Sequence, residues 1–299
     1  MNEELRLPRV VACVPVWNAA AFLGPVLAGL GAQTYSNLRI HISVDVSSDD
    51  SVQLCERFAA THSNVTVICQ TSRLGWIANS NALLATADAE YIFFAMHDDP
   101  ISPMYVERLV DAMEEHPHAV IAFSDMSSNV GTTFHYDLLE GLSDRFERAR
   151  RVFHASGSWW VPFRGMMRAS TVRELGGLRR HLAGEFSADL LWLLRLAIAG
   201  EFVRVSEALV CKRLHANSLS SIWRKGGWNA LSLRWACWNN IALARFTFAE
   251  RAYLFAETVL FACGATRCPG LLRGLKNMLL RGVRASRSRS EVFISGDTS

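Results

Sequence analysis

The feature that most constrains the fold is a regular alternation of short apolar segments with amphipathic ones across residues 9–96. The apolar segments are rich in β-branched residues and predict buried strands, whereas the segments between them predict helices. The predicted strands cover residues 9–16, 38–44, 65–69 and 90–96, and the predicted helices cover residues 19–33, 51–61 and 76–87. Such an alternation indicates βαβ units, and therefore an α/β fold with a mostly parallel central sheet flanked by helices.

Three of these strands end in polar side chains. Asn18 follows the first strand, Asp45 ends the second, and Asp98 with Asp99 follows the fourth. Ligands of open α/β sheets bind beyond the carboxyl ends of the strands. We therefore expect these side chains to lie around one ligand site at that edge of the sheet.

Composition excludes several classes of protein. The chain lacks both the G-x-G-x-x-G and the G-x-x-x-x-G-K-[S/T] loop, so side chains and a metal ion would have to hold a nucleotide. The formal charge of +3 is too small to indicate a nucleic-acid partner. Seven cysteines without a C-x-x-C pair are typical of buried thiols in a reducing compartment.

The chain also lacks the sequence signals of export. No signal-peptide core follows the N-terminus, and no segment reaches the ~18 apolar residues of a spanning helix. We expect a cytoplasmic protein, with peripheral contact at the inner face of the membrane as an open alternative.

The second half of the chain is less regular. Helices are predicted over residues 103–115, 170–175 and 190–199, a strand over 119–124 and an extended segment over 202–213, whereas residues 125–160 are hard to assign. Apolar residues 222–265 predict two helices as a C-terminal appendage. Residues 267–289 then carry seven Arg or Lys and no acid, and residues 290–299 are expected to be disordered.

Asp98 and Asp99 suit a divalent cation, because hard ions such as Mg²⁺ and Mn²⁺ prefer carboxylate oxygens. Such an ion could stabilise the charge that a leaving nucleoside diphosphate gains. An isolated Asp-Asp pair more often starts a loop and caps the next helix, so the pair alone does not decide the function.

Several motifs, in order, resemble family 2 glycosyltransferases of the GT-A fold. The segments VVACVPVWN, ISVDVSSDDS, SRLGWIANSNALL and FFAMHDDPISPMYVERL resemble the donor-binding motifs, the last being a His-Asp-Asp variant of the metal motif. FRGMMRASTVRELGGL and SADLLWLLRLAIAGEFVRVSEALVCKRLHANSLS resemble the acceptor-side motifs. The resemblance implies a glycosyltransferase domain over residues 1–221, with a donor half (about 9–125), an acceptor half (126–221) and a helical, basic extension over 222–289.

The resemblance also implies roles for individual residues. The nucleotide-binding residues would be Pro15, Trp17, Asn18, Asp45, Asn79, Asn81 and Asp98. Asp45 would contact the base, and Asp98 the ribose or a metal-bound water. Asp99 would ligate Mn²⁺ or Mg²⁺, with Asp98 and His215 as further metal contacts. Asp189 would be the general base of an inverting, metal-assisted displacement.

Three positions depart from the family pattern. Ala188 replaces the Glu that often precedes the base, Val46 replaces a second acid after Asp45, and Trp17 replaces a Tyr. A non-catalytic, glycosyltransferase-like scaffold subunit therefore stays open as an alternative. A nucleotidyltransferase is less favoured, because the segment PVWNAAAF has no basic residue for a triphosphate.

The implied donor is a nucleotide-sugar, with a UDP-sugar favoured and GDP- or dTDP-sugars as alternatives. The implied acceptor is a glycan or a lipid-linked molecule, in the synthesis of a bacterial surface polysaccharide or glycolipid. Residues 222–289 would contact either the membrane surface or a second copy of the chain.

Overall fold

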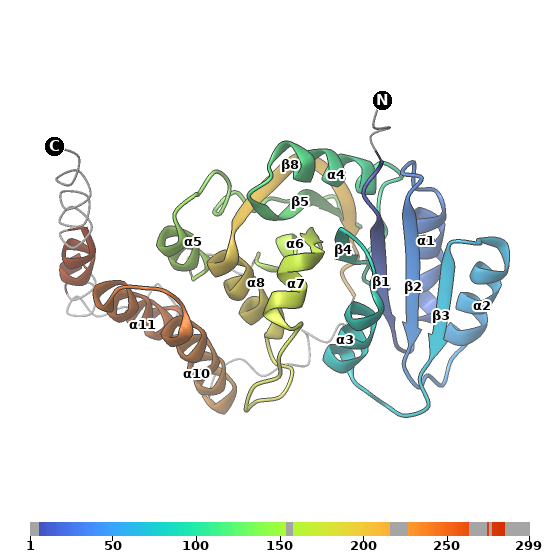
Figure 1. Ribbon diagram of the computed structural model, residues 1–299. Helices are drawn as coiled ribbons and strands as arrows, with labels where there is room; N and C mark the ends of the chain where they lie inside the picture. The colour runs from blue at the N-terminus through green and yellow to red at the C-terminus, as the bar shows by residue number, and fades with distance from the viewer. Residues whose placement is uncertain (1–5, 154–157, 216–226, 263–273, 275–276, 285–299) are drawn as a thin grey trace.

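The computed structural model describes residues 6–153, 158–215, 227–262, 274 and 277–284 (Figure 1). Its centre is an eight-stranded sheet with the order β3-β2-β1-β4-β7-β5-β6, in which β8 also pairs with β5. The strands are β1 (Val10–Val16), β2 (Leu38–Val44), β3 (Val65–Cys69), β4 (Tyr91–Phe94), β5 (Ala119–Ser128), β6 (Thr133–Phe134), β7 (Met166–Arg168) and β8 (Glu201–Lys212). The helices are α1 (Ala20–Gly31), α2 (Ser51–Thr61), α3 (Trp76–Thr86), α4 (Tyr105–Glu115), α5 (Arg145–Val152), α6 (Trp160–Phe163), α7 (Ala169–Leu175), α8 (Ala188–Ala199), α10 (Gly227–Leu243) and α11 (Phe248–Ala262).

The first half of the sheet is parallel, as the sequence predicts. β1 pairs in parallel with β2 on one side and with β4 on the other, and β2 pairs in parallel with β3. All seven residues of β1 are buried, which explains why its apolar run is continuous instead of alternating. The carboxyl ends of β1, β2 and β4 therefore meet at one edge.

The second half of the sheet is mixed. The short strand β7 lies antiparallel between β4 and β5, and β8 returns parallel to β5. This return brings Lys212, the last residue of β8, to the same edge as the ends of β1, β2 and β4. Strand β5 runs to Ser128, four residues beyond the predicted end at Ser124, because β8 pairs with it as far as Lys212.

The two apolar helices expected after residue 222 are confirmed. α10 packs against α8, and α11 packs against α5, where the rings of Phe146 and Tyr253 lie 5.4 Å apart. Of the basic segment 267–289, only residues 274 and 277–284 are described, and they are helical. The predicted disorder of residues 290–299 falls outside the described part of the chain. Within that part, no helix is both long and apolar enough to cross a membrane.

Candidate active site

The carboxyl ends of β1, β2 and β4 are joined by short hydrogen bonds. The Asp45 amide donates to the Val16 carbonyl at 2.8 Å, and Nδ1 of His97 lies 3.1 Å from the carbonyl oxygen of Pro15. Pro15 itself is buried within β1. His97 therefore ties the β4 end to the β1 end.

Asp45 is fully buried and its carboxylate accepts hydrogen bonds from the chain that follows β3. The amides of Leu74 and Gly75 each donate to it at 2.9 Å, and Arg73 forms an ion pair with it. Burial by itself would raise the pKa of Asp45, but the two amides and the Arg73 charge outweigh burial and lower it. Asp45 is consequently a fixed anion at the end of β2.

Trp17 and Asn18 lie beside Asp45 at the end of β1. The guanidinium of Arg73 stacks over the Trp17 ring at 3.8 Å from its centroid. Asn18 adopts the left-handed conformation with φ 43°, and its Oδ1 accepts from the Ser48 amide at 2.8 Å. An exposed ring, a cation and a buried carboxylate thus lie together where the sequence places the nucleotide base.

Asp99 is the most strongly paired carboxylate of the site. Arg164 donates to its Oδ2 through Nε at 2.8 Å, and Lys212 approaches its two oxygens at 3.1 and 3.2 Å. The Arg213 amide adds a hydrogen bond of 3.0 Å. Asp99 therefore holds the ends of β4, α6 and β8 together.

Asp98 faces His215 across the site. Nε2 of His215 lies 3.1 Å from Oδ2 of Asp98, and the imidazole stacks on Phe22 with ring centroids 4.4 Å apart. Burial opposes the charge of Asp98, but the charges of Lys212 and His97 outweigh it and lower the pKa of Asp98 to about 2. The side chains of Asp98 and His215 are thus in contact, whereas the binding of a metal by either residue stays a prediction.

Asp189 lies in the first turn of α8, and its carboxylate is half-buried. Trp159 donates through Nε1 to its Oδ2 at 3.0 Å, and the Leu190 amide donates to its Oδ1 at 2.9 Å. Burial raises the pKa of Asp189 above its ordinary value, although these two hydrogen bonds and the charge of Arg164 act in the opposite direction. A carboxylate with a raised pKa is suited to take up a proton.

Arg164 connects the two groups of acids. Its guanidinium is paired with Asp99 and also interacts electrostatically with Asp98 and Asp189. The positive charge of the site comes from residues that were not predicted from the sequence: Arg73, Arg164, Lys212 and Arg213. One sequence signal could have predicted that Arg164 and Lys212 are paired. Both lie at the ends of apolar segments, where burying a cation without an acidic partner would be costly.

Asn79 and Asn81 of α3 have structural partners. The Asn79 amide exchanges hydrogen bonds of 2.6 and 3.0 Å with Ser43, and the Asn81 amide does so with the backbone of Leu178 at 2.8 and 2.9 Å. A nucleotide contact by either side chain stays a prediction that requires these hydrogen bonds to be exchanged. Glu185 lies near Ala188, which stands where the family often has Glu, and it pairs with Arg180 at 3.0 Å.

The donor atoms fit a divalent cation on the Asp98–His215 side of the site. His215 Nδ1 is buried without a hydrogen-bond partner among the described residues, while Nε2 faces the Asp98 carboxylate. Metal-binding histidines commonly donate a hydrogen bond from the N–H of their second ring nitrogen to a carboxylate. Asp99 fits less well, because Arg164 and Lys212 already engage both of its oxygens. No cluster of three or more His, Cys, Asp or Glu suited to a metal occurs within the described ranges.

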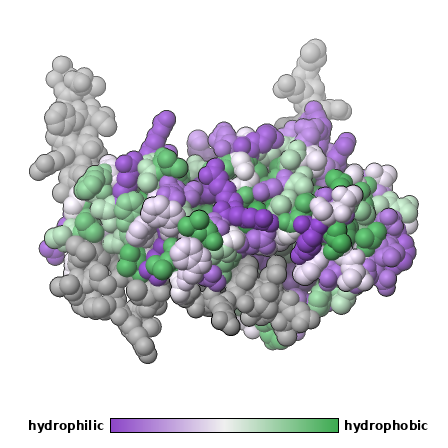
Figure 2. All heavy atoms as spheres, turned by 90° about the horizontal axis from the view of Figure 1, so that it is seen from below, coloured by the Kyte–Doolittle hydropathy of each residue, from purple (hydrophilic) through white to green (hydrophobic). Residues whose placement is uncertain are grey.

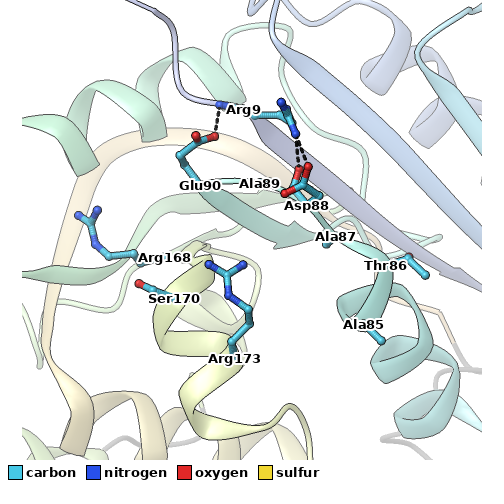
Figure 3. Close-up of a pocket in the computed structure, with 10 residues that line it drawn as sticks. All are labelled: Arg9, Ala85, Thr86, Ala87, Asp88, Ala89, Glu90, Arg168, Ser170 and Arg173. Atoms are coloured by element: carbon cyan, nitrogen blue, oxygen red, sulfur yellow. Dashed lines mark hydrogen bonds and ion pairs between the residues drawn. The ribbon is translucent and has the colours of Figure 1, made fainter.

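A cavity of about 620 Å³ lies elsewhere, at the amino ends of β1 and β4 (Figure 3). Figure 3 shows the Arg9 guanidinium directed at Asp88 and the Arg9 backbone amide bonded to the Glu90 carboxylate, with Arg168 and Arg173 on the other side. None of the predicted site residues lines this cavity. It is therefore separate from the candidate active site.

Comparison with known proteins decides the family. The profile of Glycosyl transferase family 2 matches residues 11–172, more than half of the 299 residues. The chain belongs to glycosyl transferase family 2. The matched segment contains the ends of β1, β2 and β4, with Asp45, Asp98 and Asp99, and it includes Arg164. Asp189 and His215 lie beyond it.

Relatives within this family are named glycosyltransferases. GlyG of Streptococcus pneumoniae is 27% identical over 128 residues, which are 43% of this chain and 40% of GlyG. GlyA of the same organism is 23% identical over 239 residues, which are 75% of this chain and 33% of GlyA. The chain therefore matches less than half the length of these curated relatives.

Solved structures confirm the expected GT-A fold. Residues 1–349 of S. aureus TarS, in complex with UDP-GlcNAc, align with a TM-score of 0.70 at 17% identity, covering 85% of this chain and 72% of that one. The mannosyltransferase PcManGT from Pyrobaculum calidifontis, in complex with GDP-Man and Mn²⁺, aligns with a TM-score of 0.54 at 15% identity, covering 92% and 85%.

Proposed function

We propose that this family 2 member transfers a sugar from a nucleoside-diphosphate sugar to an acceptor hydroxyl, with inversion at the anomeric carbon. The observation that carries the proposal is the position of Asp189. It is a half-buried carboxylate with a raised pKa, and Arg164 links it electrostatically to Asp98 and Asp99 at the sheet edge. A base and a charged, strand-end site that both interact with one cation suit a displacement between two bound substrates.

The nucleotide would bind over the ends of β1 and β2. Trp17 offers a ring face for the base, Asn18 and the buried Pro15 shape the pocket floor, and Asp45 offers a hydrogen-bond acceptor. The family resemblance favours a UDP-sugar as the donor. The imide N–H of uracil could donate a hydrogen bond to the Asp45 carboxylate, as could that of thymine. GDP- and dTDP-sugars are the alternatives, and Asp98 would contact the ribose.

The diphosphate would lie toward the end of β8. Lys212, Arg213 and His215 come together there, and Arg213 also lies over the Phe22 ring at 5.6 Å. These groups would bind the phosphate oxygens and stabilise the charge that develops on the leaving group. Mn²⁺ or Mg²⁺, when bound on the Asp98–His215 side of the site, would supply further positive charge to the same oxygens. Asp99 would join as a ligand only if Arg164 or Lys212 released one of its oxygens.

The chemical step would be a single displacement. Asp189 takes the proton of the acceptor hydroxyl as its oxygen attacks the anomeric carbon from the face opposite the diphosphate. The bond between the anomeric carbon and the phosphate oxygen breaks, and its electron pair leaves with the nucleoside diphosphate. Trp159 and Leu190 hold the carboxylate in place through this step.

The cellular setting would be the cytoplasmic synthesis of a bacterial surface polysaccharide or glycolipid. The acceptor would then be a glycan or a lipid-linked molecule. The extension over residues 222–289 would contact either the inner face of the membrane or a second copy of the chain.

A panel of UDP-, GDP- and dTDP-sugars tests this proposal. We expect the purified protein with Mn²⁺ to hydrolyse one of them slowly, and the base that is accepted identifies the donor class. If no donor is turned over and no nucleotide raises the thermal unfolding temperature, the protein is the scaffold subunit instead.

A further inference from the structure

The exposed face of α10 carries a stripe of large apolar side chains. Trp228, Leu231 and Trp235 follow one another at helical spacing and are 62%, 55% and 53% exposed. Leu182, from the loop between α7 and α8, is 66% exposed and lines the same groove of about 320 Å³. We call these four residues the aromatic stripe.

The aromatic stripe is not part of the core of the extension. The opposite face of α10 supplies that core, through buried residues that include Leu233, Cys237 and Ile241. α10 is therefore apolar on two faces, of which only one is covered. Figure 2 views the molecule from below and shows hydrophobic and near-neutral side chains gathered in the half that holds α10 and α11. Exposed apolar surface of this kind marks a contact with a partner or a membrane.

The aromatic stripe is tied to the acceptor side of the candidate active site. Ser232 lies on α10 within the same groove, and its hydroxyl oxygen accepts from the Ala183 amide at 2.7 Å. His181 Nδ1 also lies 2.7 Å from that oxygen. The loop that holds His181 and Ala183 continues directly into α8, whose first turn holds Asp189. A surface that covers the aromatic stripe would thus lie beside the loop that leads into α8 and Asp189.

The charge around the aromatic stripe selects the partner. Among the described residues, those that line the groove include Arg234 and no Asp or Glu. Tryptophan beside basic residues is the combination that favours the interface of an anionic bilayer, where rings sit at headgroup level and cations meet lipid phosphates. A second copy of the chain fits less well, because its own aromatic stripe would bring Arg234 against Arg234.

We propose that the aromatic stripe docks this protein on an anionic lipid bilayer and so presents a lipid-linked acceptor hydroxyl to Asp189. This inference rests on the proposed function for the role of Asp189, but the docking itself can be measured without any turnover.

Co-sedimentation with vesicles tests the docking. Wild-type protein is expected to pellet with vesicles of equal parts phosphatidylglycerol and phosphatidylcholine at low salt, and to stay in solution with phosphatidylcholine alone. The double variant Trp228→Ser/Trp235→Ser should bind the anionic vesicles at least about tenfold more weakly, since it loses the apolar part of the contact. The control Met104→Ser/Val130→Ser removes two exposed apolar side chains from other elements and should bind like wild type. Circular dichroism of each variant checks that it is folded.

Three results would overturn the proposal: no binding of wild type to anionic vesicles, equal binding by the stripe variant, or equal loss in the control. Size-exclusion chromatography with light scattering tests the second-copy alternative. If wild type is a dimer that does not bind vesicles, and the stripe variant is a monomer, the stripe serves self-association instead. The proposed function fails separately, through absence of donor turnover in solution without vesicles.

Discussion

Arg164 and Asp99 form the ion pair around which the candidate active site is arranged, with an Nη2–Oδ2 distance of 2.7 Å. Asp99 is 1% exposed and also contacts Lys212, so side chains from beyond the end of β4, the end of α6 and the end of β8 share one buried position. The pair fixes the end of β4 relative to Asp189, because Arg164 interacts with both acids. The site is therefore assembled by tertiary contacts between the two halves of the domain.

This arrangement predicts that Asp99→Asn destabilises the fold as well as the reaction. Removing one member of a buried ion pair leaves uncompensated charge, here on Arg164 and Lys212, and costs about 3–5 kcal/mol of unfolding free energy. Urea denaturation measures this loss. The control is Asp88→Asn. The Asp88 side chain is 93% exposed and pairs with Arg9, so its loss should lower the unfolding free energy by at most about 1 kcal/mol. Equal losses in both variants would contradict the structural role of Asp99.

The pKa of Asp98 predicts how stability depends on pH. Its pKa falls from 3.8 to about 2 on folding, so its contribution is complete above the unfolded value and is lost as the pH drops from about 4 toward 2. The corresponding free energy is roughly 2 kcal/mol. The Asp98→Asn variant should lose less stability than wild type over this range in acid denaturation followed by circular dichroism. Parallel curves for the two proteins would show that Asp98 carries no such linkage.

The hydrogen bond from Trp159 predicts a shift in the pH profile of the reaction. Asp189 must be ionised to accept a proton, so kcat/KM should fall as the pH drops below its raised pKa. Trp159→Phe removes a donor that lowers this pKa, and the acidic limb should therefore move to higher pH. Trp238→Phe is the matched control, because it removes an indole N–H that donates to Thr258 within the C-terminal extension. A shift in the control, or none in Trp159→Phe, would argue against Asp189 as the group that titrates.

Two adjacent glycines after α7 test the contact between this loop and Asn81 of α3. Gly176 and Gly177 both have positive φ, 71° and 76°, but a Cβ on Gly177 would lie 2.6 Å from Oδ1 of Asn81, whereas one on Gly176 meets nothing. Gly176→Ala should cost about 1–2 kcal/mol for its backbone conformation alone. Gly177→Ala should cost more, because it also disrupts the hydrogen bonds between Asn81 and Leu178. Thermal unfolding compares the two variants, and equal costs would mean that the Asn81 contact is unimportant.

The parallel half of the sheet was predictable from the sequence because its signals are local. β1, β2 and β3 are short apolar segments followed by amphipathic helices, and their bounds differ from the predictions by at most one residue. Polar residues at strand ends correctly placed Asp45, Asp98 and Asp99 at one edge. The observed Asp98–His215 contact spans more than one hundred residues, and only the resemblance to a known family could anticipate it.

The region around α5 and α6 was not predictable. The α5 sequence RFERARRV is mostly charged. Its apolar residues Phe146, Ala149 and Val152 have helical spacing, but the segment is only eight residues long, too short to assign from this period alone. The cations of the site were missed for a similar reason. Nothing in the sequence near Arg164 or Lys212 indicates that both reach the same carboxylate, since this depends on how β7 and β8 join the sheet.

The central claim is that Asp189 acts as the base of a sugar transfer. Its most direct test compares donor turnover and nucleotide affinity in Asp189→Asn with those in Asp111→Asn, the same change at an exposed position on α4. Turnover should fall by about 10²–10⁴ in Asp189→Asn and stay at the wild-type level in Asp111→Asn, while both variants bind the nucleotide as wild type does. Full turnover by Asp189→Asn would contradict the account.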